Sequence, residues 1–136
     1  MRIDHRKEHG MILIGHPWIK SPEFCRVFSE KEIKASRPDQ VVLLEPLVDS
    51  HKLAQYCQEN GVAYAVVVNT LDDAIYANAL GAAYMICDED TALMVQPTAE
   101  TYLFDTKVLV LIHSEREISK IARGGIDGAI FAEAIC

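Results

Sequence analysis

The chain has 136 residues, a formal net charge of -7 and a hydrophobic fraction of 50%. This length suits a single domain with one hydrophobic core. We expect residues 1–10 to form a flexible tail and residues 11–136 to form a single α/β domain. The acidic balance argues against nucleic acid or an anionic membrane as a partner, because both need clustered Lys and Arg. The apolar composition predicts a homo-oligomer.

The longest apolar runs, such as residues 62–68, have the length of strands and are much shorter than a membrane span. No apolar segment of signal-peptide type follows the polar first ten residues, so we expect a cytoplasmic protein. The cysteines show no C-x-x-C spacing, which predicts reduced thiols and neither a zinc site nor a disulfide framework. They are Cys25, Cys57, Cys87 and Cys136.

Strand-like and helix-like patterns alternate along the chain. Residues 15–23 contain two prolines and are expected to form an irregular connection, and residues 36–39 a turn. We expect strands at residues 11–15, 24–28, 41–47, 63–68, 83–87, 107–112 and 128–131, with helices that begin at Ser29, Ser50, Thr70, Asp90 and Ser114.

Several residues predict where these helices begin, break or end. Asp49 and Ser50 form an expected cap, and Ser114 with Glu117 has the spacing of a capping box. Glycine at the end of a helical pattern predicts a left-handed C-terminal cap. Pro97 is expected to interrupt its helix, because proline has no backbone donor.

The sequence also repeats itself. At a lag of twenty residues, Ala54 matches Ala74, Gly61 matches Gly81 and Tyr64 matches Tyr84. A further copy lies at a lag of forty-four, where Thr70 matches Ser114 and Gly81 matches Gly125. This pattern predicts a repeated unit of one strand and one helix.

Strands that are apolar at consecutive positions are buried on both faces, and their alternation with helices predicts a parallel sheet. The chain is too short for an eight-stranded barrel of roughly 250 residues. We therefore expect a small three-layer α/β domain of flavodoxin-like or Rossmann-like type, with a half-barrel that dimerises as the alternative.

A ligand site in a parallel α/β fold is expected beyond the carboxyl ends of the strands. A cluster of imidazole, carboxylate and amide groups there suits a small polar ligand, and His113 would be the general base of an enzyme. Cys87 is a candidate nucleophile beside it, although a partly buried core thiol is the favoured interpretation, because the neighbouring carboxylates would raise its pKa. Trp18 would stack on a ligand or pack at an interface, and packing is favoured. The candidates are His16, Asp49, Asn69, Cys87, Asp88, His113 and Glu133.

Helix starts and acidic runs give two further candidate sites. The helix starts at Ser50 and Ser114 are less acidic than the others and are the better anion sites. Asp88, Glu89 and Asp90 offer oxygen ligands for Mg²⁺, although a solvated charge run before a helix explains them equally well. No cofactor is indicated.

Residues 124–135, GGIDGAIFAEAI, are similar to the closing strand of phosphate-binding (βα)8 barrels, where a Gly-x-Asp-Gly-hydrophobic stretch leads into a Gly-Ser phosphate loop. Gly125, Asp127 and Gly128 fit this pattern, and residues 62–87 resemble a half-unit of such barrels. Ala132 and Glu133 stand where the loop has Gly and Ser, so phosphate binding does not carry over. The resemblance implies a barrel-like βα architecture and no named family.

Two functions from different classes remain open. The first is a non-enzymatic domain that binds a small polar ligand or a protein partner at the strand ends, or associates with itself. The second is a small hydrolase or lyase that uses His113 with strand-end carboxylates. The first is favoured, because the chain has no G-x-S-x-G, G-x-x-x-x-G-K, G-x-G-x-x-G or H-E-x-x-H motif.

Overall fold

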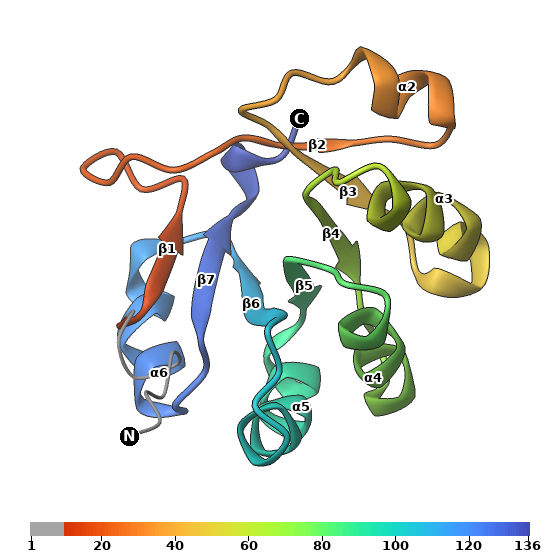
Figure 1. Cartoon of the computed structure of the whole chain (residues 1–136). Coiled ribbons are helices and arrows are strands. Elements are labelled where there is room, and N and C mark those ends of the chain that lie inside the picture. The colour runs from red at the N-terminus through yellow and green to blue at the C-terminus, as the bar shows by residue number, and fades with distance from the viewer. Residues whose placement is uncertain (1–9) are drawn as a thin grey trace, which may run out of the picture.

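The computed structural model describes residues 10–136 as strands and helices that alternate around one curved sheet (Figure 1). The predicted flexible tail therefore lies outside the described residues, except for Gly10. The strands are β1 (Ile12–Ile14), β2 (Phe24–Arg26), β3 (Val41–Leu44), β4 (Tyr64–Val67), β5 (Tyr84–Cys87), β6 (Lys107–Ile112) and β7 (Gly128–Phe131). The helices are α2 (Glu30–Ala35), α3 (Leu47–Glu59), α4 (Leu71–Ala79), α5 (Glu89–Thr101) and α6 (Ile118–Arg123), with short 3-10 helices η1 (Glu115–Glu117) and η2 (Ala132–Ala134).

The described strands form one parallel sheet in the order β1-β7-β6-β5-β4-β3-β2. The α/β class with a parallel sheet is thus confirmed. From β2 to β7 the order follows the sequence without the reversal that defines a doubly wound fold, so the architecture is the half-barrel that was the alternative, and the expected flavodoxin-like three-layer arrangement is wrong. Figure 1 shows α3 to α6 on the outer side of the curved sheet.

The C-terminal residues complete the curved sheet at its β2 edge. After β7 the chain passes through η2, and Ile135 pairs in parallel with Phe24. The Cys136 amide donates to the Phe24 carbonyl at 2.8 Å, and its carbonyl accepts from the Arg26 amide at 3.0 Å. Because an uncovered strand edge has unpaired amides and carbonyls, this segment protects β2. Figure 1 shows the C-terminus beside β2.

Apolar side chains fill both faces of the sheet. The larger core lies between the sheet and the helices and includes Val66, Met85 and Val110. A smaller core fills the concave face, where Phe24, Leu43 and Leu109 are buried. Burial on both faces explains why the strands are apolar at consecutive positions.

The helix caps differ from the predictions at two places. The helix α3 begins at Leu47 after Pro46, so Asp49 and Ser50 lie within it and the predicted cap is wrong. The helix α5 is capped by Asp88 instead of Asp90 and continues through Pro97, so the predicted interruption is also wrong. The capping box of Ser114 and Glu117 is confirmed, as are the N-cap at Thr70 of α4 and the N-cap at Ser29 of α2.

Among residues 10–136, no helix combines the length and apolar character that a membrane-spanning segment needs.

Candidate functional site

The predicted strand-end candidates follow several different strands of the sheet. Asn69, His113 and Glu133 are exposed residues after β4, β6 and β7, and no hydrogen bond joins their side chains to one another in the described part of the chain. Asp49 is in the first turn of α3 and not at a strand end. Within residues 10–136 the structure therefore shows no hydrogen-bonded catalytic group built on His113 and these residues.

Cys87 is an unsuitable nucleophile. It is the last residue of β5 and lies in the core between the sheet and the helices. Burial, with a smaller contribution from the negative charge of Asp88, raises the pKa of the Cys87 thiol to about 12. Because the thiolate is the reactive form, Cys87 is a structural thiol.

His16 is the strand-end candidate with the most contacts. Its side chain follows β1, is 9% exposed, and has Nε2 2.7 Å from Oε1 of Glu115. Nδ1 accepts a hydrogen bond from the Trp18 amide at 3.2 Å, which places a proton on Nε2. Both ring nitrogens are therefore engaged, and the imidazole has no free atom for a substrate. The Trp18 ring lies edge-on to it at 5.2 Å and is 90% exposed.

Polar groups at the two predicted anion sites already have partners within the chain. Ser50 is buried within α3, where its hydroxyl donates to the Glu45 carbonyl at 2.6 Å. At the second site, the carboxylate of Glu117 already accepts from the amides of His113 and Ser114 at 2.9 and 3.1 Å. A carboxylate of the same turn thus already lies at the start of this helix, where an anion would bind.

The acidic residues 88–90 lie at the start of α5, where Asp88 caps this helix and Glu89 contacts α6. Asp88 accepts a hydrogen bond from the Thr91 amide at 2.8 Å, and hydrogen bonds from Thr91 lower the pKa of the Asp88 carboxyl. Glu89 forms an ion pair with Lys120 at 2.9 Å. Within residues 10–136 the acidic run, including Asp90, does not bring three ligand atoms together as a metal site.

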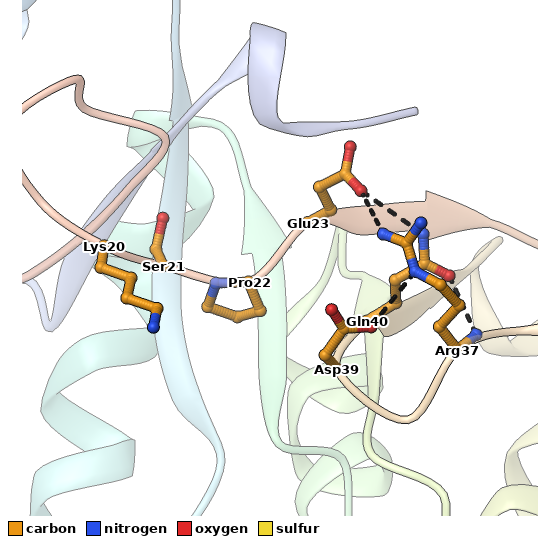
Figure 2. A pocket seen from close by; sticks show the side chains of 7 residues that line it. All are labelled: Lys20, Ser21, Pro22, Glu23, Arg37, Asp39 and Gln40. Atoms are coloured by element: carbon orange, nitrogen blue, oxygen red, sulfur yellow. Dashed lines mark hydrogen bonds and ion pairs between the residues drawn. The ribbon is translucent and has the colours of Figure 1, made fainter.

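A polar pocket of about 370 Å³ lies instead at the amino ends of β2 and β3 (Figure 2). Two loops form it, because the parallel pairing of β2 with β3 brings the segment before each strand to the same edge. Figure 2 shows Lys20 and Ser21 at one side and Arg37 at the other. The lining residues are Lys20, Ser21, Pro22, Glu23, Arg37, Asp39 and Gln40.

Arg37 organises one wall of this pocket. Its Nη2 is 3.0 Å from Oε1 of Glu23, and its Nε is 3.2 Å from Oδ1 of Asp39. Its amide donates to Oε1 of Gln40 at 3.1 Å. Lys20 faces the solvent and makes no ion pair or hydrogen bond with its side chain in the part of the chain that is described. The wall is thus held by internal contacts, whereas the ammonium group of Lys20 is available.

A disulfide lies next to this pocket. Cys25 of β2 is bonded to Cys136, and Nε2 of Gln40 donates to the Cys25 sulfur at 3.3 Å. The prediction that all cysteines are reduced is therefore wrong for this pair, whereas Cys57 and Cys87 are free and buried. No local pattern predicts this bond, because the two cysteines are 111 residues apart in the chain.

Two further pockets lie among the helices. One of about 480 Å³ lies between α3 and α4 and is mostly apolar, with Leu47, Val48 and Tyr76 in its lining. The other, of about 470 Å³, lies beside α2 and shares Arg37 and Gln40 with the polar pocket. The polar pocket is therefore one side of a longer irregular surface around the turn before β3.

No protein-family model matches the sequence, and the comparison with curated proteins found no significant match.

Proposed function

We propose that this protein is a non-catalytic binding domain whose polar pocket takes a small molecule with both an anionic and a cationic group. The lining has two cations, Lys20 and Arg37, and two carboxylates, Glu23 and Asp39. A ligand with a single charge would face a like charge on one side, whereas a zwitterion of amino-acid type can pair with both signs. The volume of about 370 Å³ lies within the range of small-molecule sites.

The free ammonium group of Lys20 is the observation that carries this proposal. The charge of Arg37 is already paired with the carboxylates of Glu23 and Asp39, so we expect Arg37 to hold these side chains in place and not to bind the ligand directly. Lys20 stands across the pocket from it and would pair with the anionic group of the ligand (Figure 2). Ser21 accepts a hydrogen bond from the Gly15 amide at 2.9 Å, so its own hydroxyl proton remains available to donate.

A binding domain also agrees better than an enzyme with the state of the candidate catalytic groups. The Cys87 thiol is buried and has a raised pKa, and the side chain of His113, the expected general base, makes no hydrogen bond in the described part of the chain. Catalysis would need a nucleophile and a base within hydrogen-bond reach of each other.

The test is a thermal-shift screen of amino acids and small carboxylates, because a ligand that binds only the folded protein raises its melting temperature. We expect zwitterions to raise the melting temperature of the unaltered protein, and Lys20→Ala to lose this shift. Lys52→Ala, which alters an exposed lysine of α3 away from the pocket, should keep it. The absence of any shift, or an equal shift in Lys20→Ala, would contradict the proposal.

Self-association is a second candidate function, and we propose a second copy of the chain as the occupant of the apolar pocket between α3 and α4. Val48 is 79% exposed and Tyr76 57% exposed at this pocket, which leaves adjacent apolar side chains in water. Sedimentation should detect a dimer that Val48→Asp dissociates, whereas Phe28→Asp, at another exposed apolar residue, should leave it intact. A monomer at high concentration would refute this candidate.

A further inference from the structure

Three potential metal ligands from the two ends of the domain meet beside the polar pocket. The carboxylate of Glu23 and the sulfurs of Cys25 and Cys136 each offer one ligand atom, and these atoms all lie within 4.8 Å of one another. Glu23 and Cys25 belong to the β2 edge, and Cys136 is in the C-terminal segment paired with it. The cluster thus exists only in the folded domain.

The backbone holds the two cysteines together independently of the bond between their sulfurs. The Cys136 amide and carbonyl bond to Phe24 and Arg26 on β2, and the Cα atoms of Cys25 and Cys136 are 4.6 Å apart. These contacts involve no sulfur atom, so reduction of the disulfide does not itself remove them. Two thiol groups would then stay side by side, next to a carboxylate.

We propose that Glu23, Cys25 and Cys136 bind one zinc-like divalent cation when the Cys25–Cys136 disulfide is reduced. Zinc binds thiolates at about 2.3 Å and carboxylate oxygens at about 2.1 Å, so a tetrahedral site needs sulfurs about 3.8 Å apart. Rotation about the Cα–Cβ bonds provides this separation once the sulfurs are no longer bonded. The two thiols release two protons to the solvent as the metal binds.

Neighbouring side chains fit this role. Three protein ligands leave a fourth position for water, and both Glu23 and Cys136 are exposed to solvent. Two thiolates, one carboxylate and a divalent cation sum to one negative charge, which Arg37 balances from 3.0 Å. Nε2 of Gln40 lies 3.3 Å from the Cys25 sulfur and can donate to a thiolate, as outer-sphere partners of metal sites do.

The remaining thiols do not compete for the metal. Cys57 and Cys87 are buried in the core under the helices, away from the β2 edge. Their burial keeps them protonated, whereas metal binding needs thiolates. The site shares Glu23 with the polar pocket, but the two proposals are tested separately, because Lys20 is no metal ligand and Cys136 does not line the pocket.

The test is a cobalt titration of the reduced full-length protein. A phosphine reduces the disulfide by taking an oxygen atom from water, whose two protons end on the sulfurs, and is then removed without air. We expect a thiolate-to-cobalt charge-transfer band that saturates at one Co²⁺ per chain and disappears when Zn²⁺ is added. The oxidised protein should show no band, because its sulfurs are bonded to each other.

Variants identify the ligands. Cys25→Ser and Cys136→Ser should each abolish the band, and Glu23→Gln should weaken cobalt binding at least tenfold. Asp39→Asn removes a carboxylate of the same pocket that is not in the cluster, and it should bind cobalt normally. Circular dichroism checks that each variant is folded. No band in the reduced protein, a band that persists in Cys25→Ser, or normal affinity in Glu23→Gln would each overturn the proposal.

Discussion

Gly128 is the position where one added methyl group should perturb the sheet most. It begins β7 and pairs with Ile12 of β1. A Cβ atom at Gly128 would lie 2.3 Å from the Ile12 carbonyl oxygen and 2.7 Å from its Cβ. Since the nearest atom belongs to the backbone, no side-chain rotation relieves this clash. The whole of β1 must move away from β7.

We therefore expect Gly128→Ala to lower the free energy of unfolding by about 2–3 kcal/mol, the upper part of the range for overpacked positions. For a domain of this size, each kcal/mol lowers the melting temperature by roughly 4 °C. The loss should be largest at β1, because it is an edge strand whose single hydrogen-bonded neighbour among the strands of residues 10–136 is β7. Amide exchange of residues 12–14 should consequently become faster than in the unaltered protein.

Gly124→Ala is the matched control. A Cβ at Gly124 would approach the flexible end of Leu93 at 3.1 Å, and the φ of Gly124 is -74°. Its unfolding free energy should change by less than about 1 kcal/mol. Urea unfolding measures both variants. Equal stability of the two, with unchanged exchange in β1, would refute the argument from the close approach of β1 and β7.

Three other predictions concern polar and thiol groups in the core and at one helix cap. Asp127→Asn should lower the free energy of unfolding by about 1–3 kcal/mol in urea. The two carboxylate oxygens of Asp127 accept hydrogen bonds from the Val108 amide and the Gln96 side chain, whereas an asparagine has only one acceptor oxygen. Unchanged stability would contradict this prediction. Because the pKa of Asp88 is lowered in the folded protein, its contribution to stability is present above about pH 4 and is lost as the pH falls further. In Asp88→Ala, the free energy of unfolding should therefore fall less steeply with decreasing pH than in the unaltered protein. The same pH dependence in both proteins would refute this prediction. Burial raises the pKa of Cys57 to about 11 and that of Cys87 to about 12, so neither thiol should react with iodoacetamide at pH 8 before unfolding, and rapid labelling of the native protein would be the opposite result.

The repeat predicted the helix ends well because each depends on a local backbone requirement. Gly61, Gly81 and Gly125 occupy equivalent positions, and their φ angles are +66°, +80° and +71°. Only glycine adopts this left-handed conformation without strain. A residue type and its neighbours decide such a feature, so the sequence contains enough information to predict it.

The strand faces were harder to predict, because the repeat does not preserve them. Tyr64 and Tyr84 match in sequence, but Tyr64 packs under the helices and donates to the Leu80 carbonyl at 2.8 Å. Tyr84 packs on the concave face, with its ring 5.2 Å from that of Phe24. A shift of one residue in a strand exchanges its two faces, and when both faces are apolar no polar pattern reveals the shift.

Tertiary packing also overrode one local signal. Pro97 removes a backbone donor from α5, yet the helix continues to Thr101. The helix buries Ala92, Val95 and Ala99 against the sheet. Most helical stability in proteins comes from such packing and not from intrinsic propensity, so the loss of one hydrogen bond does not end the helix.

The polar pocket and the cluster of Glu23, Cys25 and Cys136 depend on two long-range strand pairings that no local sequence pattern predicts. The pairing of β2 with β3 brings the loop before each strand together, and the pairing of Ile135 with Phe24 brings Cys136 to β2. Both pairings involve β2, which is an edge strand of the half-barrel and needs a partner for its unpaired backbone groups. The C-terminal segment meets that need, and in doing so it places a cysteine beside Cys25 and Glu23. The requirement to close one edge of the sheet is therefore the physical reason that the metal cluster proposed above exists at all.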